Sequence, residues 1–335
     1  MKKTVLYVLA SFILLLLLAG IYLYQYLYFP LQAPGTKKTI IIPSGTSLHS
    51  VSRKLEKQDI IPDPEKFMLL ARISGKAQSI QAGEFAVDTS WSRMRILEHL
   101  CTGQVVLHRV KIPEGLTWWQ SAELVEDSNL TEFNGFAQAV QDKSLLESFD
   151  IPANTLEGYL YPETYHLPRP VLGQAQPLVG QMVGQFYKVA RERLWPEGLP
   201  EPEEMHRTVI LASLVEKETG KPDERRRIAG VLQNRLERNM RLQCDPTVIY
   251  GLGPDFDSRL RKAELRDKDN PYNTYHHPGL PPGPICSPGL ESLKAAIHPE
   301  EHSYLYFVSK GDGSHKFSKS LKEHNQAVRK YILGN

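Results

Sequence analysis

An almost unbroken apolar segment near the N-terminus constrains this chain more than any other feature. Residues 5–28 carry no charged side chain, follow Lys2 and Lys3, and end in alternating tyrosines. At ~1.5 Å per residue such a helix crosses a hydrocarbon core of ~30 Å, and tyrosines are typical of the membrane interface. A signal peptide has a shorter apolar core and a small-residue cleavage site directly after it, which this segment lacks. We therefore expect a transmembrane helix at 5–28 after a short cytoplasmic end at 1–4.

The charges around this segment predict its orientation. The two lysines before it favour a cytoplasmic N-terminus, so everything after residue 30 lies on the other side of the membrane. Pro30, Pro34 and Gly35 indicate a tether at 29–38. We expect a single-pass protein of the inner (plasma) membrane whose working part is extracytoplasmic and uses no cofactor, because nucleotide cofactors are scarce there.

Length and composition exclude several classes of function. The 335 residues allow about two domains. With 40 basic and 38 acidic residues the net charge is +2, so the chain lacks the basic field of a nucleic-acid partner. Cys101, Cys244 and Cys286 are too scattered for a disulfide framework or a zinc site. A proline follows His298 and disfavours a helical metal pair with His302, so we expect no metal site.

Short strand-turn-helix patterns follow the tether. Strand-like runs at 39–42, 85–87 and 105–112 each precede a turn and a helix with a polar cap. The first and third units share Ile-Pro-x-Gly-x-Ser/Thr at a separation of 70 residues, which indicates a weak internal repeat. These units resemble the small sugar-binding modules of cell-wall proteins. An ordinary α+β packing domain without a ligand fits the same pattern.

The stretch 207–220 carries the strongest chemical signal. As a helix it places four apolar residues in one stripe, and Glu218 lies on that stripe while Glu216 lies on the opposite face. The stripe consists of Ile210, Leu211, Leu214 and Val215. A carboxyl on a buried face has a raised pKa and can donate a proton near neutral pH, which makes Glu218 a candidate general acid. The alternative is that Glu218 only marks the frayed end of the helix before Gly220.

Two loops rich in proline and glycine, at 243–256 and 270–289, are predicted to form the walls of a cleft. Their polar side chains could orient a sugar, and tyrosines at 159, 161 and 250 could stack on pyranose rings. The polar candidates are Gln243, Asp245, Thr247, Asn273, Thr274 and Tyr275, and the aromatic ones are Tyr159, Tyr161 and Tyr250. Neither a nucleophile elbow nor a glycine-rich phosphate loop is evident, so acyl and phosphoryl transfer rank low.

These motifs resemble the endolytic murein transglycosylases of the YceG-like family over essentially the whole chain. The matching segments are EGYLYPETY at 157–165, LASLVEKET at 211–219, RLQCDPTVIYG at 241–251, YNTYHHPGLPPGPICSPG at 272–289, SLKAAIHP at 292–299 and YLYFV at 304–308. The resemblance implies an α+β fold with a LysM-like domain at 39–107 and a catalytic domain at 108–335. It also places the catalytic acid at Glu218. Cys244 and Cys286 are departures from the family pattern, which looks like Thr or Ser at the first of them.

The resemblance implies cleavage of the bond between N-acetylmuramic acid (MurNAc) and N-acetylglucosamine (GlcNAc) inside nascent peptidoglycan strands. The single acid protonates the glycosidic oxygen and then accepts a proton from the muramic 6-hydroxyl, which forms a 1,6-anhydro end and terminates elongation. The residues expected to bind substrate are Gln243, Thr247, Asn273, Tyr275 and Tyr159. Peptidoglycan synthases are expected partners from the family alone. A noncatalytic peptidoglycan-binding scaffold and a hydrolase acting on the same bond remain alternatives.

Overall fold

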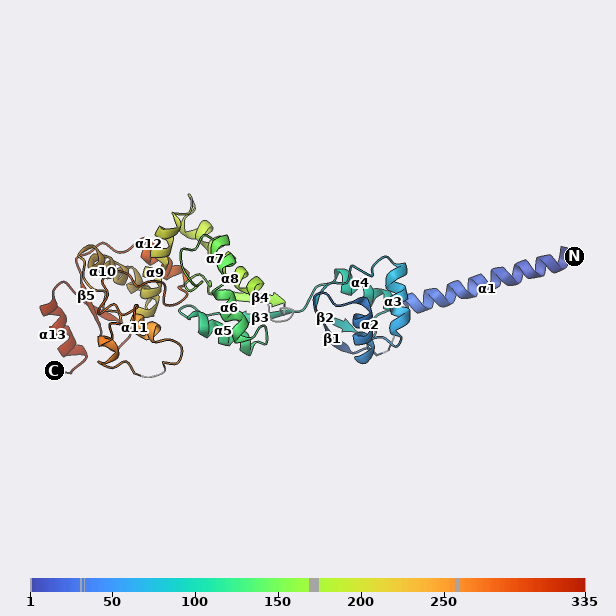
Figure 1. The fold of residues 1–335 in the computed structure, drawn as a ribbon, viewed down its shortest axis with the longest axis horizontal. Helices are drawn as coiled ribbons and strands as arrows, with labels where there is room; N and C mark the ends of the chain where they lie inside the picture. The colour runs from blue at the N-terminus through green and yellow to red at the C-terminus, as the bar shows by residue number, and fades with distance from the viewer. Residues whose placement is uncertain (1, 31, 33, 169–174, 257–258, 335) are drawn as a thin grey trace. The chain divides into compact units, whose positions relative to one another are not determined.

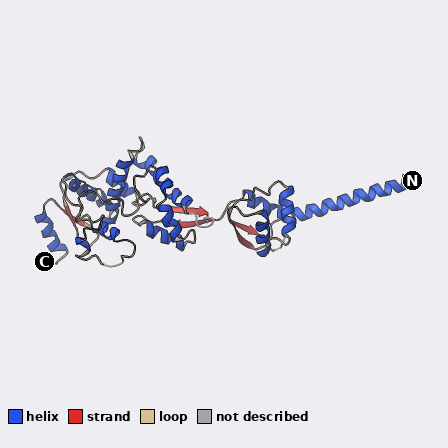
Figure 2. Ribbon diagram, in the orientation of Figure 1, coloured by secondary structure: helices blue, strands red, loops and turns tan. Residues whose placement is uncertain are grey.

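The computed structural model describes residues 2–30, 32, 34–168, 175–256 and 259–334. Its helices predominate, and its strands form short pairs (Figure 2). The chain divides into two compact units, Met1–His108 with Leu167–Leu172 and Arg109–His166 with Gly173–Asn335. The expected α+β class with an apolar N-terminal helix is confirmed.

The first helix, α1 (Lys2–Tyr28), is the first element of the chain in Figure 1. Its segment Leu6–Tyr28 is long and apolar enough to cross a membrane, and its side chains from Leu6 to Tyr24 are exposed. The C-terminal end of α1 contacts the rest of the first unit. There Nη1 of Arg93 donates a hydrogen bond of 2.9 Å to the carbonyl oxygen of Tyr26, and the guanidinium lies 4.1 Å from the centre of the Tyr26 ring.

The rest of the first unit is mainly a two-stranded antiparallel sheet with helices packed around it (Figure 1). Its elements are β1 (Lys37–Ile42), α2 (Leu48–Lys57), α3 (Pro64–Ile73), β2 (Gly83–Asp88) and α4 (Arg93–Thr102). The strands β1 and β2 are antiparallel, from the pair Lys37 and Asp88 to the pair Ile42 and Gly83. Helix α3 was not predicted from the sequence, and it begins where Asp63 caps the helix and Pro64 occupies its first turn.

The predicted repeat of strand, turn and capped helix is present as local geometry. Gly45 and Gly115 both have a positive φ, of 74° and 77°, which a glycine adopts without steric cost. Two residues later Ser47 caps α2 and Thr117 caps α5 (Trp118–Asp127), the latter as a full capping box with Gln120. The same short sequence therefore starts a helix in each unit.

The second unit consists of two successive parts, of which the second carries the site. The first part contains most of β3 (Leu107–Lys111) and β4 (Thr164–Pro168), whose remaining residues belong to the first unit. It also contains α5, α6 (Phe133–Val140), α7 (Lys143–Ser148) and α8 (Gln176–Val189), which ends in a π turn at Ala190–Leu194. The second contains α9 (Pro202–Glu218), a 3₁₀ turn at Pro222–Glu224, α10 (Arg225–Glu237), α11 (Asp245–Leu252), a 3₁₀ turn at Glu264–Arg266, α12 (Leu290–Ile297), β5 (Tyr306–Ser309), β6 (His315–Ser318) and α13 (Leu321–Tyr331). Strands β3 and β4 pair with each other.

The helix α9 begins earlier than the sequence pattern indicated. The sequence pattern predicts a helix over 207–220, but in the structure Pro202 occupies the first turn and Glu203 and Glu204 follow it. Proline has a helical φ and no N–H to leave unpaired, and acids are favoured at a helix N-terminus. The predicted stripe of α9 is buried and packs against α10 and α12, with Leu214 and Val215 fully buried.

Candidate active site

Helix α9 ends at Glu218, whose side chain faces a cavity. The backbone turns at Thr219, which is extended at φ −149° and ψ 135° and is buried. Two residues earlier, Glu216 points elsewhere, because its Oε2 accepts the N–H of Gly289 at 3.0 Å and its Oε1 lies 3.9 Å from Nη2 of Arg225. The two acids of EKE therefore have different surroundings, as their helical positions predict.

The cavity in front of Glu218 has a volume of about 490 Å³. The end of α9, α10, the loop before α11, the loop at Tyr275, the β5–β6 hairpin and α13 all contribute to its wall. The lining residues are Glu218, Arg235, Leu242, Gln243, Cys244, Asp245, Tyr275, Phe307, Val308, His324 and Val328. Of the candidates named from the sequence, the structure brings Glu218, Gln243, Asp245 and Tyr275 together here.

Burial raises the pKa of Glu218 from its ordinary value of 4.5 to about 7. A hydrogen bond with the Cys244 thiol lowers this pKa, the Asp245 carboxylate raises it, and the Arg235 guanidinium lowers it, all to a smaller extent than burial. Near neutral pH the carboxyl is therefore present in both protonation states. A group of this kind can donate a proton and accept one within the same reaction.

The loop before α11 is held in place by the loop that carries Tyr275. The N–H of Gln243 donates to the carbonyl oxygen of Thr274 at 3.2 Å, and the N–H of Cys244 donates to the Thr274 hydroxyl at 3.0 Å. Gln243 adopts a left-handed φ of 55° and its side chain is exposed to the cavity. Non-glycine residues in this conformation are costly and concentrate at functional sites.

Tyr275 and Asp245 form the polar edge of the cavity. The Tyr275 hydroxyl donates to Oδ1 of Asp245 at 2.6 Å. Burial and this hydrogen bond raise the pKa of Tyr275 above its ordinary value, so the phenol stays protonated. Asp245 is therefore an acceptor already engaged by one donor, beside the Glu218 carboxyl.

Arg235 is a site residue that our sequence analysis missed. Its side chain is buried, its Nε donates to the carbonyl oxygen of Leu305 at 2.7 Å, and its Nη1 donates to that of Leu242 at 2.7 Å. It thereby connects α10 to the loop before α11 and to the segment leading into β5. A signal existed, because Arg235 follows Ile228 by seven residues and Val231 by four, which places a charge on the apolar face of α10.

Three predicted substrate ligands are buried and do not line this cavity. The Thr247 hydroxyl donates to the carbonyl oxygen of Cys244 at 2.6 Å, and it is fully buried. The Asn273 amide donates to the carbonyl oxygens of Glu264, Leu265 and Asp267 and shapes its own loop. The Tyr159 ring is fully buried, with its hydroxyl 3.0 Å from Nδ1 of His206. A sugar contact for these three stays a prediction.

A second buried carboxyl, Glu157, was also missed. It is 1% exposed, its Oε2 accepts the N–H of Trp118 at 3.0 Å, and its Oε1 accepts the N–H of Gly158 at 3.2 Å. Burial raises its pKa to about 7, against the lowering effect of these N–H groups, of the Tyr250 hydroxyl and of Lys217. The sequence signal was an acid at the head of the otherwise apolar and aromatic stretch EGYLY.

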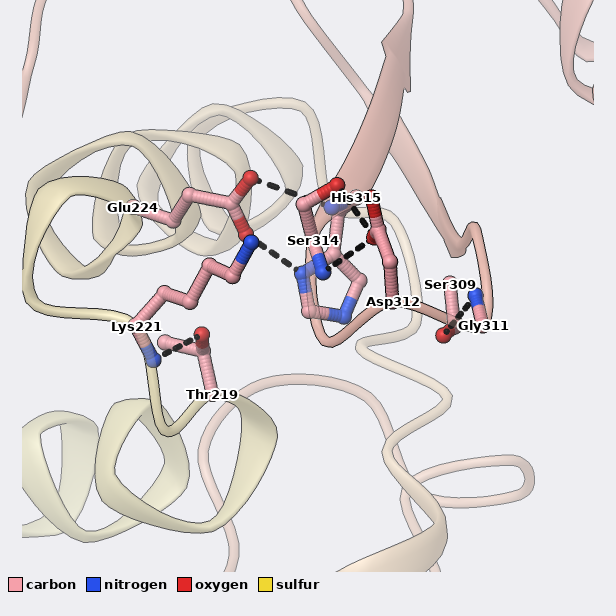
Figure 3. A network of polar contacts seen from close by, with 8 residues as sticks. All are labelled: Thr219, Lys221, Glu224, Ser309, Gly311, Asp312, Ser314 and His315. Carbon is pink, nitrogen blue, oxygen red and sulfur yellow. Dashed lines mark hydrogen bonds and ion pairs between the residues drawn. The ribbon is translucent and has the colours of Figure 1, made fainter.

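Phe307 and Val308 of the β5–β6 hairpin line the cavity. The hairpin is bonded through His315 to Glu224, six residues after the end of α9. Figure 3 shows the contact between Glu224 and His315. The backbone N–H of His315 donates to Oε1 of Glu224 at 3.0 Å, and Nδ1 of His315 lies 2.6 Å from Oε2 of Glu224. The hydrogen bonds and charge of His315 hold the pKa of Glu224 below its ordinary value, although burial opposes them. Lys221, next to Gly220, lies in the same network and is close to the turn at Asp312 (Figure 3).

The described residues contain no cluster of three or more histidine, cysteine or acidic side chains that could hold a metal ion. His302 is engaged by the protein: its Nε2 lies 2.9 Å from the carbonyl oxygen of Arg227, and its Nδ1 lies 3.3 Å from the Asn234 amide. His324 in the cavity wall stacks on Tyr306, and burial lowers its pKa.

Comparisons with known proteins agree with this architecture. The YceG-like family matches residues 40–330. The chain is 32% identical over 334 residues to an endolytic murein transglycosylase of Bacillus subtilis, covering 95% of this chain and 91% of that one. It is 28% identical over 361 residues to an endolytic murein transglycosylase of Streptococcus pneumoniae, covering 96% of this chain and 64% of that longer one.

A solved structure shares the fold as well. A YceG-like protein of Listeria monocytogenes superposes with a TM-score of 0.58 at 30% identity, and the match covers 87% of this chain and 98% of that one. The family match spans most of the chain and includes both units. This chain therefore belongs to the YceG-like family.

Proposed function

We propose that this protein is an endolytic lytic transglycosylase that cleaves the MurNAc–GlcNAc bond within peptidoglycan strands and leaves 1,6-anhydro-MurNAc ends. The observation that carries the proposal is Glu218, a carboxyl with a pKa near 7 that faces a cavity of about 490 Å³. Relatives named endolytic murein transglycosylases at 28% and 32% identity support the reaction class. The enzyme is thus a lyase acting on a polysaccharide.

In the proposed mechanism Glu218 acts twice. Its protonated carboxyl donates a proton to the glycosidic oxygen as the bond to the muramic anomeric carbon breaks, so the GlcNAc side leaves as an alcohol. The resulting carboxylate then accepts the proton of the muramic 6-hydroxyl, whose oxygen bonds to the anomeric carbon. No water is consumed and Glu218 is protonated again. Because the attacking hydroxyl belongs to the same sugar, no protein nucleophile is required.

The neighbours of Glu218 have supporting roles in this scheme. Gln243 and Tyr275 lie in the cavity with Glu218, so we assign them direct hydrogen bonds to the glycan. Thr247 and Asn273 bond backbone carbonyl oxygens and Tyr159 is buried in the core, and a sugar contact of these three residues stays a separate prediction. Arg235 keeps the cavity walls together through its bonds to Leu242 and Leu305.

A hydrolase is the second candidate, and Asp245 is the reason to keep it. Glycoside hydrolases use two carboxylates, and Asp245 lines the same cavity as Glu218. The hydrogen bond from Tyr275 to Asp245 favours a positioning role for that carboxylate over a nucleophilic one. The two reactions give different products, because hydrolysis adds one water and intramolecular attack adds none.

The deciding experiment is mass spectrometry of glycan products released by the full-length protein in detergent. We expect internal cuts and anhydro ends from the natural protein, none from Glu218→Gln, and full activity from Glu203→Gln, an exposed acid in the first turn of the same helix. Reducing ends one water heavier would establish the hydrolase. Glycan binding without any cleavage would instead indicate a scaffold that binds peptidoglycan through residues 39–107.

The location and domain roles belong to the same proposal. Leu6–Tyr28 acts as a single-pass anchor in the plasma membrane, with Lys2 and Lys3 on the cytoplasmic side. Residues 39–107 then form a LysM-like domain and residues 108–335 a catalytic domain on the outer side, where peptidoglycan and its synthases are found. Protease treatment of spheroplasts should therefore degrade the chain after residue 30, whereas degradation only in lysed cells would reverse the orientation.

A further inference from the structure

An apolar groove of about 450 Å³ lies between the end of α1 and α3. Tyr22 and Tyr26 line it from α1, and Leu69 and Ile73 line it from α3. Met94 of α4 lines it as well. The groove belongs to the first unit and is separate from the Glu218 cavity.

The outer face of α3 carries two large apolar side chains beside the exposed charges of Glu65, Lys66 and Arg72. Lys66, Leu69 and Ile73 are spaced by three and four residues and so share one face of the helix. Leu69 is 56% exposed and Ile73 is 77% exposed, the largest value among the exposed large hydrophobic side chains that the structure describes. This face continues the lining of the groove.

The groove lies at the level where α1 is expected to leave a bilayer. A hydrocarbon core of ~30 Å holds about 20 residues of helix, so a span that begins at Leu6 reaches the far boundary near Gln25. Tyr22 and Tyr26 lie on either side of that point, as interfacial aromatic residues do. The α3 face is therefore beside the boundary between acyl chains and headgroups.

Contacts within the first unit hold the end of α1 against α4, and α4 in turn contacts α3. Arg93 bonds the carbonyl oxygen of Tyr26 and stacks on its ring, and Leu27 packs against the core of the unit. Lys66, whose ammonium lies 3.0 Å from Asp63, borders the groove with a cation that can reach headgroup phosphates while its stem covers apolar surface. The expected tether at 29–38 thus joins segments that already contact each other.

We propose that the α3 face formed by Leu69 and Ile73, together with the adjoining groove, docks into the outer leaflet of the bilayer that α1 crosses. Its occupants are lipid acyl chains, as for amphipathic helices that lie in a membrane interface. The inference rests on the membrane anchor of the proposed function and goes beyond it. It holds the first unit on the membrane surface and so restricts its movement about the end of α1.

Nitroxide scanning of the full-length protein in phosphatidylethanolamine–phosphatidylglycerol liposomes tests this docking. The natural cysteines are buried, so Ile73→Cys, Leu14→Cys and Asp59→Cys can be labelled separately, and the unsubstituted protein reports background. Power saturation compares collisions with oxygen, which concentrates in lipid, against a water-soluble nickel chelate. Asp59, whose side chain is 84% exposed on the same unit, is the aqueous control, and Leu14 is the control within α1.

We expect lipid-like accessibility at Leu14 and Ile73 and aqueous accessibility at Asp59. An Ile73 label that behaves like the Asp59 label, with Leu14 still in lipid, would overturn the docking and leave the anchor standing. An aqueous Leu14 label would overturn the anchor and the docking together. As a second measurement, Leu69→Ser with Ile73→Ser should raise the chelate accessibility of a label at Met94→Cys, and an unchanged value would also contradict the proposal.

Discussion

Glu218 and Glu157 are two carboxyl groups of one unit whose pKa values are both raised by burial to about 7. Their surroundings differ in what lies in front of the oxygens. Those of Glu157 accept the N–H groups of Trp118 and Gly158, whereas Glu218 faces a cavity large enough for sugar groups. A raised pKa therefore records burial, and access to a substrate decides whether the proton can be used.

The two acids accordingly do different work in the second unit. Glu157 connects the turn that begins EGYLY to the first residue of α5, and so fixes the chain next to the turn at Gly115. Glu218 is the last residue of a helix whose apolar residues are packed in the core. The side chains that interact with its carboxyl belong to the cavity wall. Substitutions should separate a loss of folding from a loss of chemistry.

The largest effect is expected at Glu218. Glu218→Gln removes the proton donor and keeps the shape, so we expect glycan cleavage to fall by about 10²–10⁴-fold. Thermal unfolding should stay close to that of the natural protein, because the amide avoids a buried charge. Turnover of the purified variant within a factor of ten of the natural protein would mean that another group supplies the proton.

The next largest effect is expected at Glu157, on stability. Glu157→Ala leaves the N–H groups of Trp118 and Gly158 without their acceptor, which should lower the free energy of unfolding by about 1–3 kcal/mol. Urea unfolding of the full-length protein in detergent measures this, with Glu203→Gln as a neutral control. An equal loss of stability in Glu218→Gln would remove the distinction between the two sites.

Both glutamates also make stability depend on pH in the same direction. Each binds its proton up to about pH 7 when folded but only to about pH 4.5 in an unfolded chain, so the folded state holds more protons between these values. The free energy of unfolding should therefore fall as pH rises through this window and level off above it. Glu157→Gln should make the fall shallower, and an unchanged slope would show that its carboxyl does not titrate in this range.

A smaller effect on stability and cleavage is expected at Glu224, which bonds His315 of the β5–β6 hairpin. Glu224→Gln weakens the contact with His315 and should cost about 1 kcal/mol of stability and a few-fold of cleavage, because Phe307 and Val308 line the cavity. Hydrogen exchange at residues 306–318 should increase. Normal exchange there combined with reduced cleavage would place the role of Glu224 elsewhere.

The smallest effect is a shift in pH dependence. Asp245→Asn removes a negative charge that raises the pKa of Glu218, so the alkaline fall in kcat/KM should move to lower pH by less than about one unit. The exposed Asp269→Asn is a control in another loop. Hydrated reducing ends that disappear in Asp245→Asn would instead identify Asp245 as part of a hydrolase.

The sequence predicted the elements with strong periodicity better than the contacts between loops. The stripe of α9 located Glu218 because residues three, four, seven and eight apart lie on one helix face. The segment 243–256, expected to be a loop, contains helix α11 at Asp245–Leu252. Gln243 before this helix and Tyr275 of the second predicted loop line the cavity. Only tertiary structure could show that the Asn273 amide bonds three carbonyl oxygens at the 3₁₀ turn that precedes its loop.

The residues that the sequence did not reveal are polar groups that hold loops together. Arg235 bonds carbonyl oxygens of Leu242 and Leu305, which are 7 and 70 residues away, and Glu157 accepts an N–H from 39 residues away. Such partners cannot be identified from spacing. A charge placed inside an apolar pattern, as both residues are, is the signal that could have found them.

The pH profile of kcat/KM for glycan cleavage, measured for the natural protein and for Glu157→Gln, tests the central claim most directly. If Glu218 is the acid, cleavage should decline above about pH 7 in both proteins, because the titrating group faces the cavity and is unchanged. A decline that is missing from the natural protein, or that disappears in Glu157→Gln, would contradict the assignment of Glu218.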